Sequence, residues 1–320
     1  MDDMARRTAA AIPRQSGKLV YITGANSGIG YHAALELARA GSTVILGCRD
    51  SGKAATARQR ILAEVPGAQV ETATLDLSRL DSVRAAAQAF LSTGRTLDLL
   101  INNAGIMALP ERRVTPDGFE LQLGTNHFGH FALTGLLLPA LLRSKAAPAR
   151  IITVSSIAHR GATMDFDNLE WERGYQAWPA YRRSKLANLL FGFELERRFQ
   201  LAGLPAMSVV VHPGISNTNL FKAGPGSGKG LKTFIAQSIA VPLVMRVFGQ
   251  SDAQGALPTL YAATSPEIQG GRFYGPDGFR EMKGYPVEVR AELQAYDEAL
   301  AARLWEVSEQ LTGVRFAFGS

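Results

Sequence analysis

The chain of 320 residues contains a single cysteine, Cys48, so no disulfide can form within it. Disulfides belong to oxidising compartments, and their absence here favours a cytoplasmic protein. Cys48 ends an apolar run, which favours a structural thiol over a nucleophile. The five histidines form no metal-ligand pattern of the HExxH type, so we expect no metal site.

Long apolar runs and clustered charge are also missing. Residues 1–16 have no apolar core of the signal-peptide type and are predicted to be a flexible leader. The most apolar stretch, 234–248, is too short to span a bilayer and contains Pro242 and Arg246. The net charge of +6 comes from scattered basic residues without interleaved aromatic side chains, which argues against nucleic-acid binding.

Short apolar runs alternate with helical segments through most of the chain. The runs are almost continuously apolar, as a parallel sheet covered on both faces requires. We therefore predict an α/β fold with a doubly wound, Rossmann-like parallel sheet in one domain, residues 17–320. The predicted strands are 18–23, 42–47, 68–77, 97–102, 150–156 and 206–212. The predicted helices include 51–64, 79–93, 115–143, 181–199 and a terminal helix at 286–312, with turns at 273–279.

A glycine-rich loop, "TGANSGIG" (23–30), separates the first strand from the first helix. Its glycines Gly24, Gly28 and Gly30 permit a tight turn and let the backbone approach a pyrophosphate. The following helix N-terminus offers free N–H groups and the positive end of the helix dipole. A plain structural turn is the rival interpretation, but the position after the first strand favours dinucleotide binding.

The stretch "YRRSK" places Tyr181 four residues before Lys185. On a helix these two side chains share a face. A nearby positive charge lowers the pKa of a phenol by stabilising the phenolate, so the pair could give and take a proton. An ordinary surface pair has the same spacing, and other residues must decide between the two interpretations.

The order of these motifs resembles the short-chain dehydrogenase/reductase family over residues 17 to 220. The "NNAG" motif (102–105) and "HPGISNT" (212–218) belong to the same resemblance. It implies that the glycine loop holds the cofactor diphosphate, that Asp76 contacts the adenine ring and that the "NNAG" motif steadies the sheet. The implied cofactor-binding residues are Gly24, Asn26, Ser27, Gly28, Ile29, Gly30, Arg49, Asp76, Leu77, Asn103, Ala104, Gly105, Tyr181, Lys185, Pro213, Gly214 and Thr218.

The resemblance also implies the catalytic residues Asn126, Ser156, Tyr181 and Lys185. Tyr181 would be the general acid or base, with Lys185 stabilising its phenolate and bonding the nicotinamide ribose. Ser156, which matches better than Ser155, would bond the substrate oxygen, and Asn126 would hold a relay water. Structural roles are the alternatives: a helix kink at Asn126, a strand end at Ser156 and a helix cap at Asp76.

The segment between Ser156 and Tyr181 is longer than in many members of the family. The insert, residues 164–180, carries Trp171, Tyr175 and Trp178 and resembles that of the retinol-dehydrogenase-like branch. The sequence leaves open whether the serine and the tyrosine still meet.

The residues after the second strand bear on the choice of cofactor. An NAD-selective fold places an acidic residue there to hold both ribose hydroxyls. Here Cys48 and Arg49 come at about that point, and a guanidinium suits a 2′-phosphate. We therefore predict NADP, with NAD possible because Asp50 could reach the ribose after a one-residue shift.

In the family the segment after the sixth strand tends to cover the active site. Residues 215–250 would form this substrate lid, with a glycine-rich hinge (222–230) and an apolar remainder. Such a lid favours a lipophilic alcohol or carbonyl, although packing on the protein's own core would explain the same composition. The resemblance also implies a homodimer or homotetramer formed through the catalytic helix and the long helix before it.

Rival functions remain open at this point. One is a catalytically idle dinucleotide-binding sensor on the same fold. Another is a peripheral membrane enzyme that uses 234–248 as an interfacial helix. The stretch "DGFELQLGTNHFGHF" is also similar to protochlorophyllide reductases, which are a third alternative.

Overall fold

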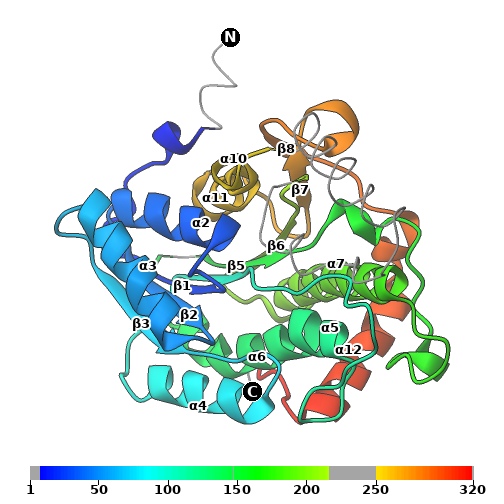
Figure 1. Ribbon diagram of the computed structural model, residues 1–320. Coiled ribbons are helices and arrows are strands. Elements are labelled where there is room, and N and C mark those ends of the chain that lie inside the picture. The colour runs from blue at the N-terminus through cyan, green and yellow to red at the C-terminus, as the bar shows by residue number, and fades with distance from the viewer. Residues whose placement is uncertain (1–7, 147, 216–249, 319–320) are drawn as a thin grey trace, which may run out of the picture.

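The computed structural model describes residues 8–146, 148–215 and 250–318. Its centre is a sheet in the order β3-β2-β1-β4-β5-β6-β7-β8, with helices on both faces (Figure 1). Neighbouring strands are parallel as far as β7, and β8 alone runs antiparallel. The predicted fold class is thereby confirmed.

The strands are β1 (Leu19–Thr23), β2 (Thr43–Cys48), β3 (Val70–Thr74), β4 (Leu99–Asn102), β5 (Ala149–Val154), β6 (Ala206–Val211), β7 (Phe273–Pro276) and β8 (Pro286–Glu288). The α-helices are α2 (Gly28–Arg39), α3 (Ser51–Glu64), α4 (Leu80–Leu91), α5 (Leu121–Leu123), α6 (Gly129–Leu142), α7 (Ala177–Ala202), α10 (Asp252–Gly255), α11 (Leu257–Thr264) and α12 (Glu298–Thr312). A π-helical turn, η2 (Gly124–Phe128), joins α5 to α6. The 3-10 turns are η1 (Ala9–Ala11), η3 (Ile157–His159), η4 (Phe166–Asn168), η7 (Phe279–Glu281) and η8 (Leu293–Tyr296).

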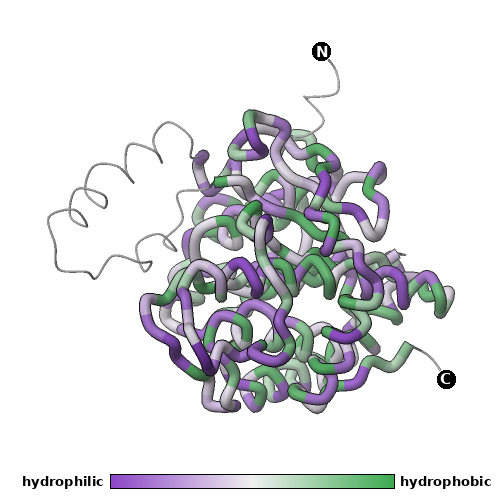
Figure 2. Tube along the Cα trace, turned by 90° about the vertical axis from the view of Figure 1, so that its right-hand side faces the viewer, coloured by the Kyte–Doolittle hydropathy of each residue, from purple (hydrophilic) through white to green (hydrophobic). Residues whose placement is uncertain are grey.

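Two apolar layers hold the sheet between its helices. On one face α2, α3 and α11 pack on β1, β2, β5 and β6, and on the other α4, α6 and α7 pack on the same sheet. Hydrophilic residues gather on several outer turns (Figure 2). The chain builds the sheet outward from β1 in one direction through β2 and β3, and from β4 in the other direction. At this reversal a crevice opens beside the carboxyl ends of β1 and β4, and sheets of this kind bind their ligands in that crevice.

The sequence prediction was wrong at two places near the C-terminus. Residues 273–279, predicted as turns, contain β7, which pairs with β6 and β8. Gly275 fits this strand because a Cβ there would lie 1.9 Å from the His212 ring. Residues 286–312, predicted as one helix, begin with β8, and α12 starts only at Glu298. The helix predicted at 115–143 is likewise divided by the π-helical turn.

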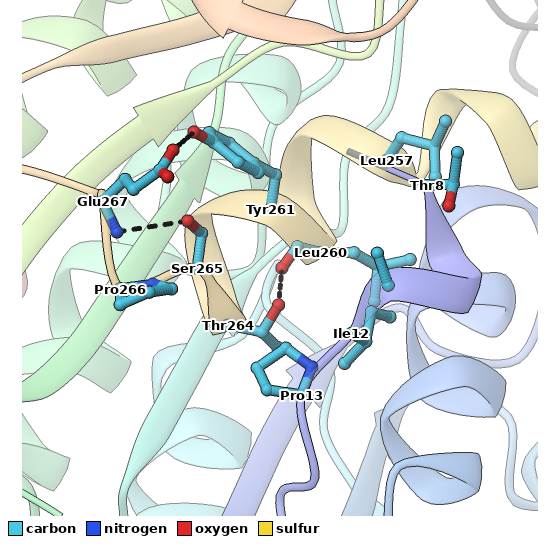
Figure 3. A pocket seen from close by; sticks show the side chains of 11 residues that line it. Thr8, Ile12, Pro13, Leu257, Leu260, Tyr261, Thr264, Ser265, Pro266 and Glu267 are labelled. Carbon is cyan, nitrogen blue, oxygen red and sulfur yellow. Dashed lines mark hydrogen bonds between the residues drawn. The ribbon is translucent and has the colours of Figure 1, made fainter. Parts of the chain in front are cut away.

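The described part of the predicted leader lies against the domain. Ala9 and Ile12 pack on the core layer that contains α2 and α11. Ile12 lies beside Leu260 of α11 (Figure 3). Both residues, with Pro13 and Leu257, line a pocket of about 230 Å³. The predicted lid, including 222–230 and 234–248, lies outside the described residues except at its ends. No described helix is both long enough and apolar enough to cross a bilayer.

The C-terminal segment closes the side of the fold formed by α6 and α7. Trp305 of α12 is 2% exposed and lies 5.0 Å from Phe131 and 5.8 Å from Phe191, measured between ring centroids. Phe316 completes the cluster at 4.8 Å from Phe131, where Gly135 leaves it room. Trp305 and Phe316 of the same chain cover this part of α6 and α7. A dimer formed through these two helices would therefore have to use the surface of α6 and α7 that Trp305 and Phe316 leave uncovered. The oligomeric state stays a prediction.

We predict that Trp305→Ala lowers the free energy of unfolding by about 3–5 kcal/mol, because it opens a cavity among the rings of Phe131, Phe191, Phe316 and Phe318. Urea denaturation followed by circular dichroism measures this change. Leu293→Ala is the control, since Leu293 is 90% exposed and its truncation should change the free energy by less than about 0.5 kcal/mol. Equal effects of the two substitutions would contradict the role given to the aromatic cluster.

Candidate active site

The glycine loop turns sharply between β1 and α2. Gly24 and Gly28 have φ of +67° and +60°, which side chains with a Cβ rarely adopt. A Cβ on Gly30 would lie 2.6 Å from the Gly24 carbonyl oxygen and 2.5 Å from the Asn103 amide nitrogen. Ser27 is the N-cap residue of α2, and among the described residues its side chain accepts no hydrogen bond from the first amides of the helix. The first amides of α2 are therefore free to bind an anion at the crevice.

The hydroxyl of Thr23 ties this loop to the "NNAG" motif. It accepts hydrogen bonds from the backbone N–H groups of Asn103 and Ala104, both at 2.9 Å. The Asn103 side chain donates to the Thr23 carbonyl at 2.8 Å. Because these amides occupy its lone pairs, the hydroxyl is left to donate to His130 Nε2, which lies at 2.8 Å.

His130 carries this connection into the helix that holds Asn126. With Nε2 as acceptor, Nδ1 bears the proton and donates to the Asn126 carbonyl at 2.9 Å. Burial lowers the pKa of His130 to about 4, so the ring is neutral at pH 7. The same ring thus contacts both the cofactor loop and the π-helical turn, a helical irregularity that is common at functional sites.

The side chain of Asn126 is fully buried, and both its nitrogen and its oxygen have hydrogen-bond partners. It accepts from Ile106 N at 2.8 Å and donates to Ile106 O and Ser184 Oγ, both at 2.9 Å. Gly105 lies beside it, and a Cβ there would be 3.3 Å from Asn126 Oδ1 and 3.5 Å from Lys185 Nζ. Asn126 therefore fixes the loop after β4 against α7, close to the lysine.

The two serines after β5 have different partners. Ser155 is 2% exposed and donates to the Lys185 carbonyl at 2.7 Å. The Ser156 hydroxyl accepts from Ala158 N at 3.1 Å, and it lies close enough to the phenol of Tyr181 to lower the pKa of that group. The serine and tyrosine thus meet despite the longer segment between them.

Burial dominates the electrostatics of Tyr181 and Lys185. It raises the pKa of Tyr181 to about 12, opposed by the nearby Ser156 hydroxyl, and lowers the pKa of Lys185 to about 8. Lys185 Nζ donates to the Val154 carbonyl at 3.1 Å and lies 5.8 Å from the centre of the tyrosine ring. The lowered tyrosine pKa expected from the sequence is not found, since desolvation outweighs any benefit from the lysine.

The insert is anchored by Arg183, one of the two arginines between the tyrosine and the lysine. Its guanidinium stacks on Trp171 at 4.3 Å and donates to the carbonyls of Asn168 and Leu169 at 2.6 and 3.2 Å. The Tyr175 hydroxyl donates to Leu109 O at 2.9 Å. The insert is thereby held beside the loop that follows β4.

These elements enclose a cleft of about 410 Å³ at the carboxyl edge of the sheet. From the predicted set it is lined by Gly24, Asn26, Ser27, Gly28, Ile29, Gly30, Arg49, Asp76, Leu77, Asn103, Ala104, Gly105, Tyr181, Lys185 and Pro213. Ser155, the weaker of the two serine candidates, and Cys48 line it as well. The lining residues that the sequence did not indicate are Gly47, Leu75, Ile106, Met107, Leu109, Thr125 and Val154. Most of these directly follow strands or adjoin a motif, which is the signal that could have found them.

The remaining predicted residues either do not line this cleft or lie outside the described residues. Asn126 and Ser156 are not among the residues that line it, and Gly214 follows Pro213 with φ of +67°. Thr218 lies outside the described residues. Asp76 accepts hydrogen bonds from the N–H and hydroxyl of Ser78 at 3.0 and 2.7 Å through Oδ1, which orders the turn after β3. Within the described ranges, no group of three or more His, Cys, Asp or Glu side chains could hold a metal ion.

A glycine loop at the crevice of a doubly wound sheet, facing a buried tyrosine and lysine, defines a nucleotide-dependent oxidoreductase. The model of the short chain dehydrogenase family matches residues 18–224, and the chain belongs to this family.

Relatives place it in the retinol-dehydrogenase-like branch. Retinol dehydrogenase 14 of Homo sapiens is 41% identical over 313 residues, covering 93% of this chain and 87% of that protein. The crystal structure of an uncharacterized protein from Mycobacterium paratuberculosis is 42% identical, with a TM-score of 0.76, covering 97% of this chain and 98% of that one. A Pseudomonas aeruginosa RhlG complex with NADP is 26% identical, with a TM-score of 0.60, covering 81% and 94% of the two chains.

Acid should destabilise the protein through its buried histidines. Burial lowers the pKa values of His127 and His130 to about 3 and about 4, from an ordinary 6.5. Between pH 6.5 and 4 the unfolded chain binds protons that the folded chain excludes, so the free energy of unfolding falls as the pH falls. Each histidine contributes up to about 1.4 kcal/mol per pH unit.

His130→Gln should therefore flatten the dependence of the free energy of unfolding on pH in this range, as measured by urea denaturation at several pH values. Leu293→Ala, which removes no titrating group and leaves both buried histidines in place, should leave the slope unchanged. A slope that survives the His130 substitution would mean that another group controls the acid transition.

Proposed function

We propose that the protein is an NADP(H)-dependent oxidoreductase that interconverts a lipophilic alcohol and its carbonyl compound. The observation that carries this proposal is that Tyr181 and Lys185 line the same cleft as the glycine loop, with Ser156 close to the phenol. An idle sensor would need the loop but not the proton-transfer group, which is why we favour an enzyme.

The cleft fits a nicotinamide dinucleotide. Gly24 and Gly30 have no space for a Cβ, and the uncapped N-terminus of α2 would hold the diphosphate. Lys185 would bond the nicotinamide ribose, and Pro213 would lie near the ring. When bound, the nicotinamide supplies the hydride for reduction or accepts it in oxidation.

The chain's own residues would handle the proton and the substrate oxygen. With a pKa of about 12, Tyr181 is protonated at neutral pH and suited to donate to the oxygen of a carbonyl under reduction. Ser156 would orient the same oxygen and stabilise its developing charge. Lys185 keeps most of its positive charge at pH 7, and this charge favours the phenolate that remains on Tyr181.

The preference for NADP rests on Arg49. Arg49 is exposed and lines the cleft after β2. Its rival, Asp50, is the N-cap of α3 and accepts from Lys53 N at 3.0 Å. Since that bond holds Asp50 at the helix start, Arg49 is the better placed residue to bind a ribose phosphate.

A lipophilic substrate is suggested by the apolar residues near Tyr181. Met107 and Ala108 pack on the tyrosine, and Leu109 lines the cleft. Trp178 is 39% exposed, with its ring 6.0 Å from that of Tyr181. The relative named retinol dehydrogenase makes retinol and retinaldehyde the first compounds to try.

Tyr181→Phe should fold and bind NADP(H) but lose at least about 99% of its turnover, because only the proton-carrying oxygen is removed. Steady-state reduction of retinaldehyde and cofactor binding by fluorescence measure the two properties. Tyr296→Phe, at a tyrosine 48% exposed on η8, is the control. Turnover of Tyr181→Phe within a factor of two of the unmodified protein would refute the assigned mechanism.

Arg49→Ala should weaken NADP(H) binding about 10- to 100-fold and change NAD(H) binding by less than about threefold, since the phosphate contact is worth roughly 1.5–3 kcal/mol. Titration calorimetry with both cofactors measures the difference. Arg58→Ala is the control, since Arg58 lies in the middle of α3 and donates to Val70 O at 2.7 Å. Equal weakening of both cofactors would remove the basis for the preference.

Along a series of straight-chain aldehydes, kcat/KM should rise with each added methylene until the site is full. Each buried methylene contributes up to about 0.8 kcal/mol. Trp178→Ala should reduce this gain and leave the smallest aldehyde least affected. A flat series, or a preference for small charged carbonyls, would contradict a lipophilic substrate.

A further inference from the structure

A strained turn lies beneath the Pro213–Gly214 segment. Its central residues Arg280 and Glu281 have φ of +51° and +58°, and neither is a glycine. Consecutive left-handed residues cost of order 1–3 kcal/mol each unless the surroundings hold them, and such strain gathers at functional sites. The contacts of Glu281 show what holds it.

The Glu281 carboxylate receives two side-chain donors. Arg160, which follows η3 and the catalytic Ser156, donates to Oε1 at 2.6 Å. His212, at the end of β6, lies with Nε2 3.0 Å from Oε2. Burial alone would raise the pKa of Glu281, but the bonds from His212 and Arg160 outweigh it and hold the pKa below its ordinary value. The carboxylate is therefore ionised at neutral pH and accepts from both partners.

Glu281 thereby selects the tautomer of His212. The ring is fully buried, and burial lowers its pKa, so it is neutral at pH 7. Because Nε2 faces a carboxylate, Nε2 bears the proton and Nδ1 is left as an acceptor. Nδ1 receives the N–H of Gly214 at 3.2 Å.

The same turn fixes Gly214 from its other side. A Cβ on Gly214 would lie 2.3 Å from the Met282 carbonyl oxygen, so this backbone approach requires glycine. Ile215 N donates to that carbonyl at 2.8 Å. The segment at the nicotinamide end of the cleft is thus held by His212 on one side and by the strained turn on the other.

We propose that Glu281 is a positioning residue that fixes the His212 tautomer and, through it, the Gly214 turn against which the nicotinamide lies. Through Arg160 it also holds this turn in register with the segment that begins at Ser156. The inference rests on the proposed function for the identity of the ligand, but the tautomer and the turn are properties of the chain itself.

The pair Glu281→Gln and Glu281→Gly tests the positioning role against a structural one. A glutamine has one acceptor oxygen for the two donors, Arg160 and His212. A glycine removes the carboxylate and adopts the positive φ at this position without strain. Both should lower kcat for retinaldehyde reduction at least 10-fold, because a displaced nicotinamide is poorly aligned for hydride transfer. The Kd for NADP should change less than threefold, since the diphosphate and adenine contacts remain. Turnover is compared well below the Tm of each variant.

Two control substitutions separate the carboxylate from its surroundings. Arg280→Gly relieves strain at the neighbouring position but keeps the carboxylate, so kcat should be unchanged and Tm unchanged or higher. Glu288, on β8, forms an exposed ion pair with Arg272. Glu288→Gln breaks this pair and should also leave kcat unchanged. If Glu281→Gln or Glu281→Gly keeps kcat within twofold while only Tm falls, Glu281 is structural and the proposal is overturned.

A second measurement does not depend on turnover. In ¹⁵N-histidine spectra at pH 7, His212, assigned by loss of its signals in His212→Gln, should carry its proton on Nε2. In Glu281→Gln the Nδ1–H form should appear, and the Gly214 amide should exchange with solvent at least 10-fold faster. An Nδ1–H or doubly protonated His212 in the unmodified protein overturns the proposal. Lack of turnover with every carbonyl, alongside the expected spectra, would instead refute the proposed function.

Discussion

The hydroxyl of Thr23 is the point on which the cofactor loop and the catalytic helix both depend. It is fully buried at the end of β1 and satisfies two backbone amides of the "NNAG" motif. A buried donor or acceptor without a partner costs about 1–3 kcal/mol, so these groups are held in one arrangement. His130 extends that arrangement to the Asn126 carbonyl, and the Asn126 side chain then fixes the loop beside Lys185.

Burial also sets the protonation states on which the proposed chemistry relies. Tyr181 is 7% exposed and Lys185 4% exposed, so each is driven toward its neutral form. The phenol is a neutral acid over the physiological range, while the ammonium remains charged at a cost that the Val154 carbonyl offsets. Ser156 completes the group from the strand end next to them. The fold therefore supplies alignment and electrostatics, and a bound cofactor would supply the redox chemistry.

Much of this site could be predicted from the sequence because it lies in short, contiguous motifs. The glycine loop and the tyrosine–lysine spacing depend on local geometry, namely a strand–turn–helix and one helical turn. The crevice follows from the alternation of strands and helices, which fixes where the parallel strands end. The contact between the Glu281 carboxylate and the His212 ring could not be predicted, because the two residues are 69 positions apart. They come together because β7, which precedes Glu281, pairs with β6, which precedes His212.

Other features were hidden because their signals were ambiguous. β7 has only four residues and includes a glycine and a proline, which predict a turn until Phe273 and Tyr274 are found to be buried. Arg183 lies between the tyrosine and the lysine, where a charged residue ordinarily faces solvent. Its role became visible only when the insert folded back and presented Trp171 and two carbonyls to it.

We propose that this cleft aligns NADPH and a lipophilic carbonyl for direct hydride transfer. It is tested most directly with NADPH deuterated at both C4 positions, mixed with the protein and retinaldehyde, followed by mass spectrometry of the product. The account predicts retinol with one deuterium on its carbinol carbon, formed in step with loss of the reduced cofactor. Retinol without that deuterium, or no alcohol from retinaldehyde or from any long-chain aldehyde while NADPH remains bound, would contradict it.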